Sequence, residues 1–217
     1  MTEKRQIKSK QRVTYHGEVF TAEREVKAMC DLVKQETERI ESRFLEPACG
    51  NGNFLAEILS RKLAVVKARY RKSPTDYEKY SVLAVTSLYG VELLPDNAAE
   101  CRARLFSLWD EAYTANNRQA ADEQCRAAVR FILEKNILCG NALTLLQADG
   151  APIIFAEWSI VTGNQIKRRD FMLHELMNDN PEQGRIGWEY DEEIQAFIPT
   201  PIREFPLTDY RRVQDYA

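Results

Sequence analysis

Two glycines, Gly50 and Gly52, lie between the apolar segment Phe44–Leu45 and an amphipathic segment that begins near Asn53. Glycine lacks a Cβ atom, so the backbone there can adopt left-handed dihedral angles and a ligand can lie directly against it. Backbone amides at the start of the following helix would point at such a ligand. Ordinary strand-to-helix turns also use glycine, so the spacing alone leaves both interpretations open.

A single acid, Glu92, ends the predicted strand 87–92. In nucleoside-binding α/β folds, an acid at the end of the second strand accepts hydrogen bonds from the ribose hydroxyls. Glu92 has the position that this role requires. The alternative is a surface glutamate at a strand end, which needs no ligand.

Apolar periodicity predicts the elements that would position these residues. Residues at helical spacing predict a helix from about Asn53 to Tyr70, and Ser73-Pro74 ends it. Pro95 suits the first turn of the next helix, and Asn116-Asn117 separates that helix from another. Further strands are predicted over residues 136–143 and 152–155, and Thr21 is a plausible N-cap for a helix that follows it.

Composition excludes several classes of protein. The chain has 217 residues, a net charge of −3, a pI of about 5.6 and 44% hydrophobic residues, as expected for one substantial core and not for a strongly basic nucleic-acid binder. The five cysteines form no C-x-x-C pair and there are two histidines, so we expect no metal site. With no signal peptide and no long apolar run, we expect a cytoplasmic protein without a membrane span.

The segment from Glu46 to Leu55 resembles motif I of the S-adenosylmethionine-dependent DNA adenine methyltransferases, usually Asp-Pro-Ala-Cys-Gly-Ser-Gly-x-Phe-Leu. Glu46 replaces the aspartate and Asn51 the serine. Gly17 to Thr21 resembles motif X, with Ala22 in place of proline; residues 90–93 resemble motif II and residues 140–143 motif III. The resemblance covers about residues 13–160 in the order X, I, II, III and a degenerate IV, and it implies a restriction-modification enzyme.

This resemblance implies a Rossmann-like class I methyltransferase fold, α/β, with a largely parallel sheet flanked by helices and an incomplete C-terminal part. It also implies that the cofactor is S-adenosyl-L-methionine. Phe20 and Thr21 would border its methionine end, Glu92 would bind its ribose, and Asn141 would lie near its adenine ring, although an Asn after Gly is also a common turn residue. The complete set of implied cofactor-binding residues is Phe20, Thr21, Glu46, Pro47, Ala48, Gly50, Gly52, Phe54, Glu92, Leu93, Asn141 and Ala142.

The resemblance fails at motif IV, the catalytic Asn/Asp-Pro-Pro-aromatic segment. That motif binds the amine of an adenine flipped out of the duplex. Residues 155–159 read Phe-Ala-Glu-Trp-Ser instead, and the tetrapeptide occurs nowhere in the chain. Glu157 could accept from the amine and Trp158 could stack on the base. The alternative, a surface Glu157 and a core Trp158, is at least as well supported.

Three regions are expected: a flexible basic tail over residues 1–12, a cofactor-binding domain over 13–180, and a C-terminal extended arm over 181–217. A helix is predicted around Arg169–Asn178. The arm would pack back on the core or dock on a partner. No target-recognition region follows residue 160, so sequence-specific DNA reading would come from elsewhere, and a partner subunit or homo-oligomer is expected.

Three functions remain open. The first is an enzyme that methylates the adenine amino group of DNA, which the cofactor motifs favour. The second is a non-catalytic cofactor-binding or scaffold subunit of a larger methyltransferase assembly, which the missing tetrapeptide favours. The third is a methyltransferase that acts on RNA or protein.

Overall fold

Three parallel strands form the centre of the protein. The computed structural model describes residues 6–177, 188–192 and 196–217. The strands β1 (Phe44–Glu46), β2 (Leu88–Glu92) and β3 (Ile137–Asn141) lie in the order β1-β2-β3, with Leu45 opposite Tyr89. The carboxyl ends of all three therefore meet at one edge of the sheet. A short strand, β4 (Leu146–Gln147), pairs antiparallel with β3.

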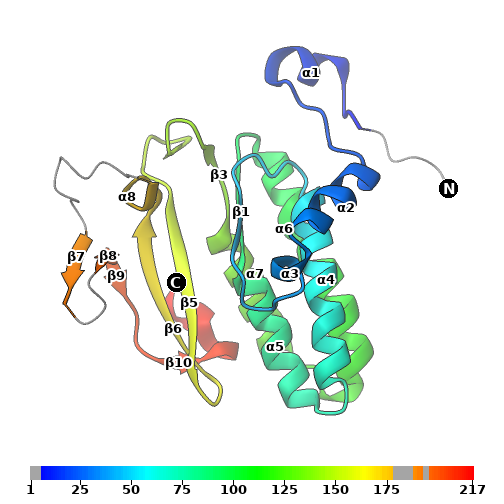
Figure 1. Cartoon of the computed structure of the whole chain (residues 1–217), viewed down its shortest axis with the longest axis vertical. Helices are drawn as coiled ribbons and strands as arrows, with labels where there is room; N and C mark the ends of the chain where they lie inside the picture. Colours follow the sequence, from blue (N-terminus) through cyan, green and yellow to red (C-terminus); the bar gives the residue numbers. More distant parts are fainter. Residues whose placement is uncertain (1–5, 178–187, 193–195) are drawn as a thin grey trace.

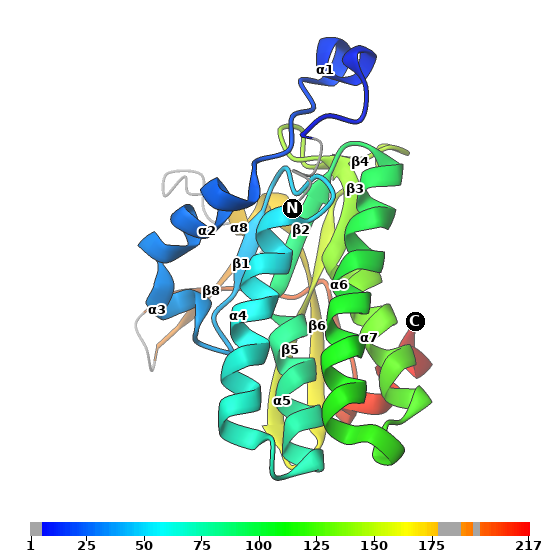
Figure 2. The same ribbon diagram turned by 90° about the vertical axis from the view of Figure 1, so that its right-hand side faces the viewer.

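Four long helices cover one face of these strands, as Figures 1 and 2 show. They are α4 (Asn53–Tyr70), α5 (Pro74–Thr86), α6 (Pro95–Asn117) and α7 (Glu123–Asn136), with the 3-10 turn η1 (Arg118–Ala120) between the last two. The predicted helices at 53–70 and after Pro95 and Asn117 are confirmed. Helix α5, which Ser73 caps through the amide of Asp76, fills the long stretch between the first two strands.

The alternation of side chains along β2 divides the core into two clusters. Leu88 points into the large cluster formed with the helices, whereas Tyr89 and Val91 belong to a smaller cluster with Phe155 and Leu173. Because successive side chains of a strand point to opposite faces, the smaller cluster lies on the face away from the helices.

A hairpin of two long strands packs on that second face. It consists of β5 (Ile154–Thr162) and β6 (Gln165–Met172), followed by the short helix α8 (Leu173–Met177). The prediction of a helix around Arg169–Asn178 is therefore wrong over residues 169–172. The buried face of β6 carries Arg168 and Asp170, which form a two-bond ion pair at 2.8 Å. This charged pair hides the apolar alternation that would have indicated a strand.

Strand β5 runs opposite to β3. Asn136, just before β3, accepts a hydrogen bond from Trp158, whereas Leu145, beyond its end, accepts one from the amide of Ile153. A parallel strand would need a crossover of a dozen or more residues, usually a helix, and the connection from β3 holds only β4 and turns. The predicted largely parallel sheet is thus limited to β1, β2 and β3, and the fold is mixed α/β.

The end of the chain packs back on the helical layer. The short strands β9 (Arg203–Glu204) and β10 (Thr208–Asp209) pair with β6, and the 3-10 segment η3 (Tyr210–Tyr216) lies against α7. Tyr210 is buried and donates a 2.7 Å hydrogen bond to the buried Glu78. Of the two alternatives for the predicted arm, this part packs on the core. The strands β7 (Trp188–Asp191) and β8 (Ala196–Pro199) form a separate hairpin.

The described N-terminal segment starts beyond the carboxyl ends of the parallel strands and continues beside α4 (Figure 1). It forms α1 (Lys10–His16), α2 (Glu23–Leu32) and α3 (Lys34–Thr37). Thr21 is not the N-cap that we predicted: α2 is preceded by Ala22 without a side-chain cap. Residues 1–5 lie outside the described part of the chain, and the division into tail, domain and arm stays a prediction. Among the described helices, none has the length and apolarity to cross a membrane.

Candidate functional site

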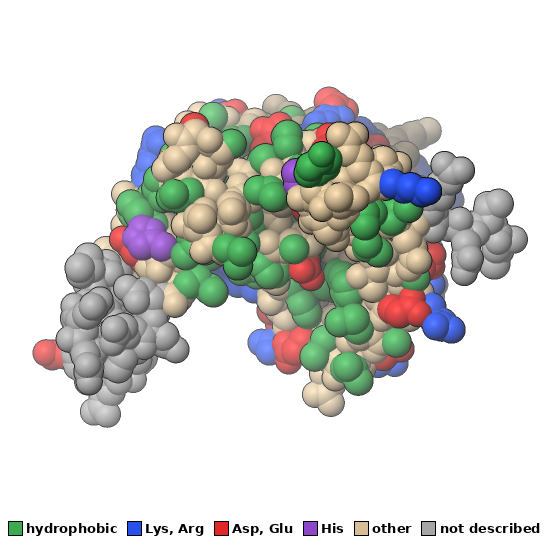
Figure 3. Space-filling model, turned by 90° about the horizontal axis from the view of Figure 1, so that it is seen from above, with side chains coloured by type: hydrophobic (Ala, Val, Ile, Leu, Met, Phe, Trp, Pro, Cys, Tyr) green, Lys and Arg blue, Asp and Glu red, His purple; other side chains and the backbone are tan. Residues whose placement is uncertain are grey.

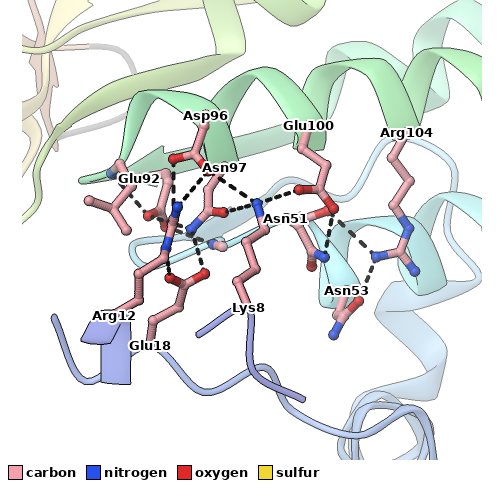
Figure 4. Close-up of polar contacts among 12 residues, drawn as sticks. Lys8, Arg12, Glu18, Asn51, Asn53, Glu92, Asp96, Asn97, Glu100 and Arg104 are labelled. Atoms are coloured by element: carbon pink, nitrogen blue, oxygen red, sulfur yellow. Dashed lines mark hydrogen bonds and ion pairs between the residues drawn. The ribbon is translucent and has the colours of Figure 1, made fainter. Parts of the chain in front are cut away.

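A hydrogen-bonded junction at the carboxyl ends of β1 and β2 joins the glycine turn to Glu92 (Figure 4). The amide of Gly50 donates to Oε2 of Glu92 at 2.8 Å, and the amide of Leu94 donates to Oε1 at 3.0 Å. Glu92 is only 8% exposed. A buried carboxylate requires such donors, so the junction fixes the turn and the acid relative to each other.

The glycine turn needs its glycines for conformation and for space. Gly50 and Gly52 have φ angles of +54° and +84°, in the left-handed region. A Cβ on Gly52 would lie 2.6 Å from Sγ of Cys101, and one on Gly50 would lie 3.2 Å from the ring of Phe20. Cys101 and Phe20 therefore pack directly against the backbone of the turn, and the position of Phe20 beside the cofactor's methionine end stays a prediction.

Other residues proposed from the sequence lie around the same edge. The carbonyl of Thr21 accepts from Nδ2 of Asn53 at the start of α4. Pro47 and Ala48 are exposed in the turn. Burial raises the pKa of Glu46 at the end of β1, although a hydrogen bond from the Ala48 amide opposes the shift.

Asn141 behaves as a turn residue in this structure. Its Oδ1 accepts from the amide of Leu143 at 2.9 Å and, more weakly, from the amide of Thr144 at 3.4 Å. Its neighbour Ala142 packs against the smaller core cluster, and Phe54 packs against the larger one. Asn141 thus ends β3 at the carboxyl edge, but its side-chain oxygen already has internal donors.

Exposed apolar side chains lie at the carboxyl edge of the parallel strands, between the glycine turn and the loops after β2 and β3, and we call this edge the crevice. Figure 3 views this end of the molecule and shows hydrophobic side chains among charged ones. Leu93 is 54% exposed and Leu143 is 94% exposed, and Val19 of the N-terminal segment is also exposed. Such a surface suits an aromatic ring that is held by apolar contact.

Glu157 and Trp158 lie away from this crevice. Trp158 is 4% exposed, packs edge-on against Phe131 and donates a 2.9 Å hydrogen bond to Asn136 in the core. Because Glu157 precedes it in β5, the carboxylate points to the opposite face. There Glu157 pairs with Arg43, just before β1, at 2.7 Å and also with Arg169.

Trp158 therefore occupies the core position that the alternative interpretation assigned to it, whereas the Glu157 side chain is partly buried, at 16% exposed, and is not a free surface acid. Glu157 lies toward the amino end of β1, at the edge of an apolar hollow of about 280 Å³ beside that strand. Both of its oxygens already accept from arginine. The structure does not bring Glu157 or Trp158 together with Glu92 and the glycine turn.

Sequence reasoning missed a polar cluster that covers the crevice. Lys8 and Arg12 from the N-terminal segment reach the first turns of α6, and the two guanidinium N–H groups of Arg12 bind both oxygens of Asp96 at 2.7 and 3.1 Å. Arg12 also pairs with Glu18. Half of a signal did exist: Asp96 and Glu100 are four residues apart and lie on one side of α6, whereas Lys8 precedes α1 and shares no helical face with Arg12.

The cluster shifts the pKa values of its acids. Hydrogen bonds from Arg12 and, secondarily, from Lys8 lower the pKa of Asp96 to about 2. Burial alone would raise the pKa of Glu100, but Lys8 and Asn51 outweigh burial and lower it. Contact with Cys101 and burial both raise the pKa of the Cys49 thiol, which therefore stays protonated near neutral pH.

No cysteine or metal chemistry is indicated in the part of the chain that the structure describes. All five cysteines are free, and four of them are buried. No group of three or more His, Cys, Asp or Glu side chains in residues 6–177, 188–192 and 196–217 could hold a metal ion.

The mixed α/β fold, with parallel strands flanked by helices, is compatible with a methyltransferase domain. A model of the family described as "MmeI, DNA-methyltransferase domain" matches residues 21–164. The match covers more than half of the 217 residues, so the chain belongs to this family of restriction-modification DNA methyltransferase domains. No curated protein and no solved structure matches the chain. The match includes both glycines, Glu92 and β5, whereas Lys8 and Arg12 lie outside it.

Proposed function

We propose that the crevice binds S-adenosylmethionine and that the chain serves methylation of the adenine amino group in DNA. The observation that carries the proposal is the junction in which the Gly50 amide donates to the buried Glu92 at 2.8 Å. A buried acid beside the glycine turn supports the proposal, because an acid at the end of the second strand binds ribose hydroxyls in nucleoside-binding α/β folds. Family membership supplies the reaction class.

The residues present fit this cofactor. A carboxylate offers about four acceptor sites, and three protein donors use part of those on Glu92, which leaves an acceptor site on Oε2 for a ribose hydroxyl. The exposed Leu93 suits the adenine ring. Because Asn51 Nδ2 donates to Glu100, its Oδ1 faces elsewhere; it is buried and lacks a hydrogen-bond partner. That acceptor suits the ammonium group of the methionine part.

When bound, S-adenosylmethionine supplies an electrophilic methyl group. The chain's own contribution is to bind and orient: Glu92 would hold the ribose, and the turn from Glu46 to Gly52 would hold the methionine end with Phe20 and Thr21 beside it. Orientation and exclusion of water are the main protein contributions to such a transfer.

The acceptor side of the reaction points to a second candidate function. Both oxygens of Glu157 are engaged by Arg43 and Arg169, and Trp158 is buried. Neither residue is placed to receive an adenine at the crevice. This geometry favours a cofactor-binding subunit whose catalytic groups come from a partner chain. A methyltransferase acting on RNA or protein would use the same crevice.

Calorimetric titration with S-adenosylmethionine and S-adenosylhomocysteine tests the proposal. We expect micromolar binding, about 8 kcal/mol, and a loss of at least tenfold in Glu92→Ala. Unchanged affinity in that variant would refute the ribose role, and no binding by the folded chain would refute the cofactor site.

Transfer of a labelled methyl group to DNA separates the two candidates. Transfer by the chain alone, retained in Glu157→Gln, would support an enzyme that uses other acceptor groups. Transfer only after a co-expressed partner is added would support the subunit. Transfer to RNA or protein but not to DNA would support the third possibility.

A further inference from the structure

The ammonium group of Lys8 lies at the centre of the cluster over the crevice (Figure 4). Its Nζ donates to Oδ1 of Asn97 at 2.7 Å and pairs with Asp96 and Glu100. It also lies 6.0 Å from the centre of the Phe20 ring, which packs on Gly50. Lys8 therefore contacts groups on both sides of the junction between the glycine turn and Glu92.

The first branch from Lys8 passes through Asn97, which is 1% exposed. An ammonium group has donors only, so the atom of Asn97 that faces it must be the amide oxygen. The NH₂ group then faces the other way, where it donates to Oε1 of Glu92 at 3.2 Å and to Glu18 at 3.3 Å. Lys8 thus sets the orientation in which Asn97 donates to Glu92.

This orientation has a consequence for Glu92. Oε1 receives the Leu94 amide and Asn97, whereas Oε2 receives only the Gly50 amide. The remaining acceptor capacity is therefore concentrated on Oε2, the oxygen on the glycine-turn side. Without Asn97, the carboxylate would have one fewer restraint and could rotate.

The second branch from Lys8 passes through Glu100. The carboxylate of Glu100 pairs with Lys8 and accepts from Nδ2 of Asn51 at 3.0 Å. This contact orients the amide of Asn51 so that its buried Oδ1 is left without a partner. Each branch ends on a residue that would contact the cofactor.

We propose that Lys8 is a positioning residue of the cofactor site, acting through Asn97 on Glu92. This inference rests on the proposed function. Lys8 lies outside the residues matched by the family model, in a segment that composition alone marks as a basic tail. The role differs from simple attachment of that segment, because Arg12 also attaches it through Asp96 and Glu18.

The test compares two ligands on the full chain: S-adenosylhomocysteine and its 2′,3′-dideoxyribose analogue. We expect Lys8→Met to weaken binding of the first about tenfold more than binding of the second, a difference of about 1.4 kcal/mol, because both ligands carry the ammonium group that would contact Asn51. Asn97→Ala should show the same selective loss, and the double variant should lose little more than either single one. Lys8→Arg should restore binding in part, and Lys10→Met, at an exposed position of α1, is the matched control.

The outcomes separate the inference from the proposed function. If the unaltered chain binds S-adenosylhomocysteine but Lys8→Met loses affinity equally for both ligands, Lys8 only attaches the segment and the inference is refuted. Full retention of affinity would refute it as well. If the unaltered chain binds neither ligand, the proposed function itself is refuted, together with any role for Lys8 in it. Thermal unfolding of each variant shows whether the fold is retained.

Discussion

Replacement of Gly52 by alanine tests the geometry of the glycine turn most directly. The φ angle of +84° is unfavourable for any residue with a Cβ, at about 1–2 kcal/mol. The new Cβ would also lie 2.6 Å from Sγ of Cys101, a steric overlap that forces one of the two groups to shift. Overpacking of this kind costs about 1–3 kcal/mol, so we expect a total destabilisation of about 2–5 kcal/mol.

Two matched variants separate the two contributions. Gly150 has nearly the same φ angle, +83°, with open space around it, so Gly150→Ala should lose only the backbone contribution of about 1–2 kcal/mol. In a Cys101→Ala background the nearest atoms to the new Cβ lie at 3.5 and 3.6 Å, which is ordinary contact. Gly52→Ala should therefore lose only the same 1–2 kcal/mol there.

Urea unfolding followed by circular dichroism measures all four chains of this cycle. The expected coupling between the substitutions at positions 52 and 101 is about 1–3 kcal/mol. Equal losses from Gly52→Ala in the two backgrounds would show that the turn and α6 are not packed as described. A loss no larger than that of Gly150→Ala would lead to the same conclusion.

Three further predictions concern buried polar groups. Tyr210→Phe should lower the free energy of unfolding by about 1–3 kcal/mol, because it removes one hydrogen-bond donor to the buried Glu78. Tyr216→Phe, at an exposed ring, is the control and should change the free energy of unfolding little. Equal effects of the two substitutions would contradict the docking of η3. Burial lowers the pKa of Lys62 from an ordinary value near 10.5 to about 7, so the charged form of Lys62 opposes folding. Between about pH 7 and 10 the unfolded chain binds one more proton than the folded chain, so the free energy of unfolding should rise with pH, by up to about 1.4 kcal/mol per pH unit. Lys62→Met should remove this rise. Glu157→Gln should leave the calorimetric affinity for S-adenosylhomocysteine unchanged, because Glu157 pairs with Arg43 before β1; a tenfold loss would place it at the crevice instead.

Local signals in the sequence were enough to predict α4, α6 and α7 of the helical layer, but not α5, and one side of the site. Three predictions used only neighbours within a few residues: the helix over 53–70 from its apolar spacing, the helix start at Pro95, and the turn at the two glycines. The position of Glu92 at a strand end follows from the same kind of local pattern. The structure joins Glu92 to Gly50, which the order of the motifs had implied.

Long-range pairing decided the features that were predicted wrongly from the sequence. The segment that begins at residue 152 is predicted to be a strand, but its direction depends on whether a crossover precedes it. The connection after β3 is short and holds no crossover helix, so β5 runs antiparallel to β3. That direction buries Trp158 beside Asn136 and places Glu157 by Arg43. Likewise, Arg168 and Asp170 look like surface residues until their pairing shows that they form the buried face of β6.

By itself the sequence determined the family, the order of the strands and helices that carry its motifs, and the residue types at the crevice. These features are set by local periodicity and by short motifs. The tertiary structure alone decided which distant polar groups meet: Lys8 reaches Asn97 across 89 residues of sequence. Contacts of this kind depend on how distant segments pack, because an ion or amide finds its partner only after the core has placed both.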